Sequence, residues 1–202
     1  LVDVSAAALA KGLGTIAKSL ERLVGKGKLT GEESVATLAR LVSGGDLAAL
    51  SGCDLVVEAV VEKFEVKRQV LLALDPLLAA HAILATNTSS ISITRLAAVT
   101  ARPDRVIGMH FMNPVPLMQL VEIIRGKQTN DATLAVAMDY VKRIKKTPIV
   151  VNDSRGFYTS RVFSTYTGEG MRMLAEGINP ALIENAGKMT GMPMPPLALS
   201  DE

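Results

Sequence analysis

The feature that most constrains the fold is an alternation of short extended runs with helical runs through the middle of the chain. Runs rich in β-branched and apolar residues predict strands at residues 54–61, 82–86, 105–110, 120–124 and 148–151. Apolar residues at helical spacing predict helices between them, at residues 62–78, 92–98 and 130–144. Strands that alternate with helices form βαβ units, so the pattern predicts a parallel sheet covered by helices.

Helical patterns flank this central region on both sides. Before it, residues 1–4 are expected to end a strand, and apolar residues spaced from Leu9 to Leu23 predict a helix. After it, no further strand is expected, and helices are predicted from Phe157 towards Glu176 and from Asn179 onward. We therefore expect a sheet-containing domain at residues 1–153 and the start of an all-α domain at residues 154–202.

Composition excludes several classes of function. The chain has 202 residues, of which 49% are hydrophobic and 21% charged, a balance typical of a folded chain rather than a disordered one. Only 3% are aromatic, and 22 basic residues are mixed with 20 acidic ones, so we expect no nucleic-acid binding. No apolar run is long enough to span a bilayer. The single cysteine, Cys53, is typical of a reducing compartment, so we expect a cytoplasmic protein, with a mitochondrial location left open.

A glycine pair near the start of the chain resembles a dinucleotide-binding fingerprint. Residues 12–17, GLGTIA, match the pattern G-x-G-x-x-A. That fingerprint requires a strand immediately before a tight turn at the first glycine. Here residues 6–11 continue the helical pattern in phase, so we interpret Gly12 and Gly14 as helix residues.

His110 and Glu122 are the first candidates for catalysis. His110 ends a predicted strand, and Glu122 lies in the next extended run. In open α/β sheets, chemistry takes place at the carboxyl ends of strands. An imidazole can accept a proton at neutral pH, and a carboxylate bound to its other nitrogen fixes the tautomer and raises its basicity. The alternative is a structural histidine with an unrelated glutamate, and we expect His81 to be structural.

Two further strand ends carry polar residues. The segment NTSS, residues 87–90, follows a predicted strand, where its hydroxyl and N–H groups either hold a ligand or cap the next helix. Asp3 ends the first extended run and either binds ribose hydroxyls, as in dinucleotide folds, or caps the following helix. The sequence has no spacing typical of metal ligands, of a nucleophile elbow or of a P-loop, so no metal is expected.

Residues 85–124, ATNTSSISITRLAAVTARPDRVIGMHFMNPVPLMQLVEII, closely resemble the signature of 3-hydroxyacyl-CoA dehydrogenases. The resemblance extends to LVVEAVVEKFEVK (residues 55–67), GFYTSRVF (residues 156–163) and AGKMTGMP (residues 186–193). It covers essentially the whole chain, and its final part is most similar to the dehydrogenase part of multifunctional fatty-oxidation enzymes.

The resemblance implies a fold and shows how much of the family's domains this sequence would cover. The fold is a Rossmann-type, doubly wound and mostly parallel α/β sheet, followed by the start of an all-α domain. The resemblance places the first strand and its glycine-rich loop before Leu1, and more of the helical domain after Glu202. For that reason we expect the 202-residue chain by itself to be inactive.

The activity implied is the NAD-dependent oxidation of (S)-3-hydroxyacyl-CoA to 3-ketoacyl-CoA in fatty-acid β-oxidation. NAD is expected rather than NADP because Asp3 would repel a 2′-phosphate. The expected partners are the acyl-CoA substrate and either a second copy or a multifunctional complex, joined through the helical domain. The alternatives are a non-catalytic structural relative and a 3-hydroxyacid dehydrogenase of the 6-phosphogluconate type.

The resemblance also implies catalytic roles. His110 would be the general base, and Glu122 would hold it oriented. Ser89 would hydrogen-bond near the substrate oxygen and the nicotinamide. Many members carry Asn where this chain has Ser160, whose hydroxyl can still donate one hydrogen bond but reaches less far than an amide.

The remaining implied contacts are with the cofactor and with CoA. The cofactor contacts, besides Ser89, are Asp3, Ala59, Glu62, Lys67 and Asn113. Ser19 and Lys26 would meet the CoA portion, where the lysine suits a phosphate as a point charge.

Overall fold

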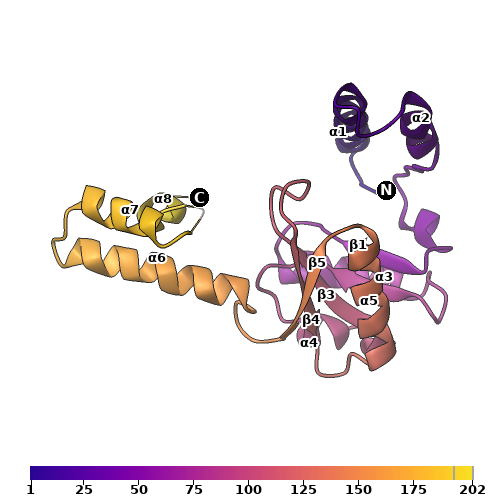
Figure 1. Ribbon diagram of the computed structural model, residues 1–202. Helices are drawn as coiled ribbons and strands as arrows, with labels where there is room; N and C mark the ends of the chain where they lie inside the picture. Colours follow the sequence, from indigo (N-terminus) through magenta and orange to yellow (C-terminus); the bar gives the residue numbers. More distant parts are fainter. Residues whose placement is uncertain (193, 202) are drawn as a thin grey trace.

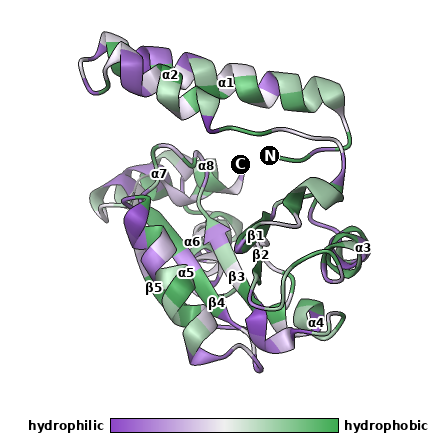
Figure 2. Ribbon diagram, turned by 90° about the vertical axis from the view of Figure 1, so that its right-hand side faces the viewer, coloured by the Kyte–Doolittle hydropathy of each residue, from purple (hydrophilic) through white to green (hydrophobic). Residues whose placement is uncertain are grey.

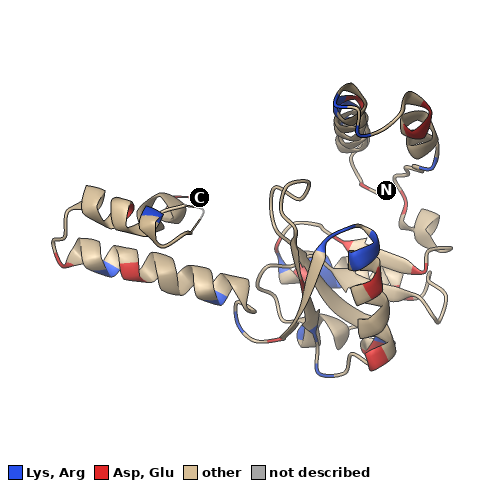
Figure 3. Ribbon diagram, viewed as in Figure 1, with Lys and Arg blue, Asp and Glu red and all other residues tan. Residues whose placement is uncertain are grey.

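The computed structural model describes residues 1–192 and 194–201. Pro193 and Glu202, which belong to the expected helical domain, lie outside the described residues. The chain has three parts in space: a helical hairpin, a sheet with helices on both faces, and a group of helices on the far side of the sheet from the hairpin (Figure 1). Acidic and basic residues are interspersed over these parts (Figure 3).

The centre of the molecule is a five-stranded sheet in which the strands follow one another in sequence order. The strands are β1 (Leu55–Glu58), β2 (Ile83–Thr86), β3 (Val106–Phe111), β4 (Leu120–Arg125) and β5 (Thr147–Asn152). All neighbouring strands are parallel except β3 and β4, which are antiparallel. Residues 112–119 join that pair without a helix, and so short a connection cannot make a parallel crossover. The expected mostly parallel α/β sheet is confirmed.

Helices cover both faces of the sheet. One face packs against α3 (Phe64–Leu74) and α4 (Ile93–Ala97), the other against α5 (Asp131–Arg143) (Figure 1). A short 3-10 turn, Pro103–Arg105, leads into β3. Because side chains alternate along a strand, Val106 of β3 joins the core under α3 and α4, whereas Met109 joins the core under α5. Each Leu or Ile side chain buried in these cores contributes about 1.5–3 kcal/mol.

Gly108 allows α4 to approach β3 closely. A Cβ atom at this position would lie 2.8 Å from Cβ of Ile124 on β4 and 2.8 Å from Cδ1 of Ile93 on α4. Both neighbours are fully buried, so neither can move aside without repacking the core. The glycine therefore fixes how close the α4 helix sits to the strand that carries His110.

The amino-terminal part is a pair of helices that stands apart from the sheet (Figures 1 and 2). In α1 (Ala6–Gly25), which begins after the N-cap Ser5, Gly12 and Gly14 are confirmed as helix residues. A capping box between Thr30 and Glu33 begins α2 (Gly31–Ala39), and a 3-10 turn, Leu47–Leu50, leads to β1.

The strand expected at residues 1–4 is wrong. Val2 forms only an isolated bridge with Gly44, and Val4 is 98% exposed. A strand needs a partner along its length, and among the described residues only this one pairing is made.

The carboxy-terminal part contains α6 (Thr159–Ala175), α7 (Pro180–Met189) and α8 (Pro196–Ser200), which pack on one another. In the described part of the chain no strand follows β5, as expected. None of the described helices is long and apolar enough to cross a membrane.

Gly108→Ala should lower the free energy of unfolding by about 1–3 kcal/mol, because the new methyl group overpacks the core. Gly14→Ala is the matched control: nothing lies within 4 Å of its added Cβ, and the helix should gain roughly 0.5–1 kcal/mol. Urea denaturation measures both changes. Equal effects of the two substitutions would contradict the close packing of α4 on β3.

Candidate active site

His110 and Glu122 face each other across β3 and β4. They are partners in the register of this antiparallel pair, and directly opposite residues project from the same face of a sheet. His110 Nδ1 lies 2.8 Å from Glu122 Oε2. This contact leaves the second ring nitrogen, Nε2, for another partner. The imidazole side chain is 13% exposed, so a ligand at the carboxyl end of β3 can reach it.

Glu122 is a fully buried carboxylate surrounded by donors. Oε1 accepts the backbone N–H groups of Tyr158 at 3.0 Å and Thr159 at 2.8 Å, and Oε2 accepts the Thr159 hydroxyl at 2.8 Å. Burial raises the pKa of the Glu122 carboxyl, but hydrogen bonds from His110, Thr159 and Tyr158 outweigh burial, so the pKa lies below its ordinary value. The carboxylate is therefore ionised at neutral pH.

A left-handed turn brings the start of α6 to Glu122. Gly156 and Phe157 have φ angles of 74° and 46°, a backbone region that residues other than glycine rarely adopt. The Phe157 ring is buried in the core under α3 and α4, and its centroid lies 6.2 Å from that of His110. The helical part of the chain thus completes a site that the sheet begins.

Glu62 ties together the loops that follow β1 and β2. Its Oε1 accepts hydrogen bonds from the Thr88 hydroxyl at 2.5 Å and from the N–H groups of Ser89 at 2.9 Å and Ser90 at 3.1 Å. Burial raises the pKa of Glu62, but these hydrogen bonds and the nearby Lys67 charge outweigh it and lower the pKa overall. Ser89 stays exposed at the carboxyl end of β2, beside the loop from which Glu62 comes.

Lys67 is held by protein partners in the turn after β1, and its role as a cofactor contact stays a prediction. Its side chain is fully buried, and its ammonium donates to Glu58 at 2.9 Å and to the Val60 carbonyl at 3.2 Å. Glu62 Oε2 lies 3.4 Å away, and the Thr86 hydroxyl also donates to Glu58, at 2.6 Å. An ammonium has three donors, so these partners occupy it fully. These contacts fix the turn between β1 and α3.

Lys67→Met should lower the free energy of unfolding by about 3–5 kcal/mol, because it leaves the buried Glu58 charge without its partner. Lys63→Met, at an exposed position before α3, is the control and should change stability little. Thermal and urea denaturation measure both variants. Unchanged stability of Lys67→Met together with weaker NAD binding would contradict this structural role and support the predicted role of Lys67 as a cofactor contact.

The other predicted residues fall in two places. Ala59 and Asn113 are exposed in the loops after β1 and β3, and Asn87 Oδ1 accepts the Phe111 N–H at 3.0 Å, which joins the ends of β2 and β3. Asp3 is exposed just before α1, where one carboxylate oxygen accepts the Ser5 N–H at 2.8 Å.

Ser19 and Lys26 lie on the α1–α2 hairpin, which stands apart from the sheet (Figure 1). Ser160 is the second residue of α6, half-buried and next to Thr159. It lines a shallow hollow with Gly156, Arg161 and Ser164.

Sequence reasoning missed three residues that hold the site together: Thr159, Asp153 and Lys146. Asp153 caps α4 by accepting from the Ser92 hydroxyl at 2.8 Å and the N–H groups of Ile93 at 3.0 Å and Thr94 at 2.7 Å. Burial raises the pKa of Asp153, and these hydrogen bonds outweigh it, so the pKa is lowered.

Lys146 holds the loop that carries Asn113, because its ammonium donates to the carbonyls of Val115 and Met118, each at 2.6 Å. The position of Asp153 directly after the last strand was a weak signal for a strand-end role. No local pattern pairs Lys146 with the loop, because that contact joins segments distant in sequence.

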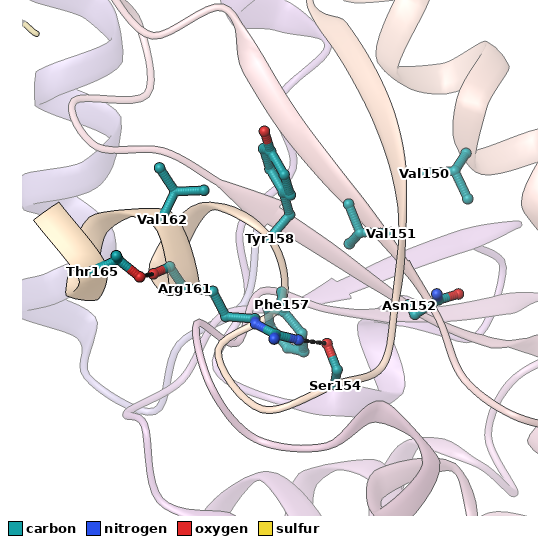
Figure 4. A pocket seen from close by; sticks show the side chains of 9 residues that line it. All are labelled: Val150, Val151, Asn152, Ser154, Phe157, Tyr158, Arg161, Val162 and Thr165. Atoms are coloured by element: carbon teal, nitrogen blue, oxygen red, sulfur yellow. Dashed lines mark hydrogen bonds between the residues drawn. The ribbon is translucent and has the colours of Figure 1, made fainter.

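A separate hollow of about 540 Å³ lies between β5 and the start of α6 (Figure 4). Val150, Phe157 and Val162 are among its lining residues, and Arg161 reaches Ser154 across it at 3.5 Å. His110, Glu122 and Ser89 are not among the residues that line it. This hollow is therefore separate from the His110–Glu122 pair. Within the described residues, no group of three or more His, Cys, Asp or Glu is arranged to hold a metal ion.

Comparison with known families decides the identity of the chain. Residues 1–154 match the NAD binding domain of 3-hydroxyacyl-CoA dehydrogenase, and residues 156–202 match the C-terminal domain of the same enzyme. This chain belongs to the 3-hydroxyacyl-CoA dehydrogenase family. As a member of that family it is an oxidoreductase that uses NAD.

Individual members of the family are similar over nearly the whole chain. A 3-hydroxybutyryl-CoA dehydrogenase of Bradyrhizobium diazoefficiens is 46% identical, over 100% of this chain and 69% of the relative. The crystal structure of (S)-3-hydroxybutyryl-CoA dehydrogenase from Ralstonia eutropha is 44% identical with a TM-score of 0.95, over 99% of this chain and 71% of that one. The dehydrogenase part of a multifunctional enzyme from C. elegans is 27% identical with a TM-score of 0.61, over 91% of this chain and 43% of that one.

Proposed function

We propose that this 3-hydroxyacyl-CoA dehydrogenase oxidises short (S)-3-hydroxyacyl-CoA thioesters in fatty-acid β-oxidation, with His110 as the general base. The observation that carries the proposal is the 2.8 Å contact between His110 and the buried, ionised Glu122 at the carboxyl end of β3. The printed substrate of the similar proteins, 3-hydroxybutyryl-CoA, supports a short acyl chain.

In this mechanism His110 Nε2 accepts the proton of the substrate's 3-hydroxyl group. Glu122, held at Nδ1, fixes the tautomer that leaves Nε2 as the acceptor and stabilises the imidazolium that forms. The exposed Ser89 hydroxyl, on the neighbouring parallel strand end, donates to the substrate oxygen. NAD, when bound, would supply the acceptor for the hydride that leaves the substrate carbon bearing the 3-hydroxyl group.

The residues at this edge of the sheet fit NAD. Ala59, Ser89 and Asn113 are exposed and follow β1, β2 and β3, at the edge where open α/β sheets bind dinucleotides. Asp3 is exposed, and one of its carboxylate oxygens is used by Ser5, so the other can accept a ribose hydroxyl. Glu62 acts on this site by holding the Thr88–Ser90 loop in place.

The hairpin and the carboxy-terminal helices supply the remaining partners. Lys26 is exposed at the end of α1 and would meet a CoA phosphate, with the half-buried Ser19 on the same helix beside the CoA chain. The helices α6 and α7 expose large apolar side chains, among them Met171, Leu182 and Met189. Such a surface supports association with a second copy of the protein.

His110→Gln, made in the full-length protein, should reduce kcat for NADH formation from 3-hydroxybutyryl-CoA by about 10²–10⁴-fold, the range expected for a lost general base. His81→Gln is the matched control, because His81 is exposed and its partner Asp54 lies outside the site. Absorbance at 340 nm measures the rate, and circular dichroism checks the fold.

Equal rates for His110→Gln and wild type would contradict the role of His110. Absence of NADH formation in the full-length wild type, with any acyl-CoA, would favour the non-catalytic relative. Oxidation of free 3-hydroxyacids but not of CoA thioesters would favour a dehydrogenase of the 6-phosphogluconate type.

Ser160→Ala should reduce kcat/KM by roughly 2–10-fold, the effect of removing one neutral hydrogen bond to the substrate. Ser164→Ala, one turn further along α6 and lining the same hollow, should leave kcat/KM unchanged. Steady-state kinetics with varied 3-hydroxybutyryl-CoA distinguishes the two. If neither variant differs from wild type, Ser160 does not contact the substrate.

A further inference from the structure

We propose that the Thr159 hydroxyl sets the proton affinity of the His110–Glu122 pair, which makes Thr159 a positioning residue for the base. The inference rests on the proposed role of His110. It starts from the hydrogen bonds of one carboxylate, in which His110 and Thr159 share a single oxygen atom.

Glu122 has no acceptor position to spare. A carboxylate offers about four lone-pair sites. Oε1 accepts the N–H groups of Tyr158 and Thr159, and Oε2 accepts His110 Nδ1 and the Thr159 hydroxyl, the last two both at 2.8 Å. The side chain is fully buried, so protein donors alone satisfy the charge.

The shared oxygen couples the hydroxyl to the base. A donor to a carboxylate favours its charged form and lowers its affinity for a proton. The same donation reduces the negative charge that Oε2 presents to the imidazole, so the carboxylate holds a protonated ring less tightly. A general base works best when its proton affinity matches the operating pH. The Thr159 hydroxyl therefore lowers the affinity of the Glu122 carboxylate, and through it of the pair, for a proton.

Few charged groups in the surrounding elements compete with this effect. No Asp, Glu, His, Lys or Arg occurs in β2 and its following loop (residues 83–92), in the loop 112–119, or in β5. His110 is the only such residue of β3. On β4, the other charged residue is Arg125, which pairs with Asp131 at 2.6 Å.

The remaining nearby ionisable groups have other partners or face solvent. Tyr158 is 59% exposed, and Arg161 reaches Ser154. On the face of α4, Arg95 lies 4.1 Å above the Phe64 ring, and Asp153 is bound to the start of that helix. The acidic and basic residues of α5 belong to the opposite face of the sheet. Substitution of Thr159 therefore removes one hydrogen-bond donor to Glu122 without changing the charge of the site.

Thr159→Val removes the hydroxyl and keeps the shape of the side chain. We expect the acid limb of the kcat/KM profile and the titration midpoint of the Glu122 carboxyl, followed by ¹³C NMR, both to move to higher pH by roughly 0.5–1 unit, the effect of one lost hydrogen bond. Both values belong to the coupled pair. Thr159→Ser keeps the donor and should restore the wild-type values. Thr167→Val, which removes a hydroxyl bound within α6, is the control and should shift neither.

Two results would overturn the proposal: an unshifted Glu122 midpoint in Thr159→Val, or a lower kcat with an unchanged pH profile. The second result would show a purely structural role. Thr159→Ala removes the same donor if the valine variant does not fold. The NMR titration requires no turnover. A full-length wild type that forms no NADH would therefore contradict the proposed function while the Glu122 midpoints still decide this inference.

Discussion

The antiparallel register of β3 and β4 is the constraint on which the site depends. It places His110 directly opposite Glu122 on one face of the sheet, at the edge where β1 and β2 also end. A shift of one residue would turn one of the two side chains to the opposite face, because side chains alternate along a strand. The tight fit of Gly108 under Ile93, two residues before His110, opposes such a shift.

Four carboxylates, three of them buried or half-buried, hold the elements of this edge together. Glu58 binds Lys67, Glu62 binds the loop after β2, Asp153 caps α4, and Glu122 receives the start of α6. Each of these anions is satisfied by hydrogen bonds, which is the condition for burying a charge without a large loss of stability. The same contacts that stabilise the fold therefore also fix the positions of the exposed groups around His110.

Much of this structure could be predicted from local pattern. The spacing of apolar residues located the strands and helices, and the helical phase before Gly12 showed that GLGTIA does not form a phosphate-binding turn. The site was predictable only in part. His110 and Glu122 were candidates because each belongs to an extended run, but their contact depends on register. Lys67 shows the limit most clearly, because its position on a helix does not reveal that its ammonium binds the buried Glu58, nine residues earlier in the chain.

The sequence by itself determined the α/β class, the order of the elements and the chemical groups available for proton transfer. These follow from periodicity and residue type, which are local properties of the chain. Tertiary structure decided which groups meet: His110 with Glu122 across two strands, and Thr159 with Glu122 through the left-handed turn at Gly156 and Phe157. Such contacts depend on strand register and on the direction in which the chain re-enters the sheet edge. Neither quantity is encoded in any single local segment.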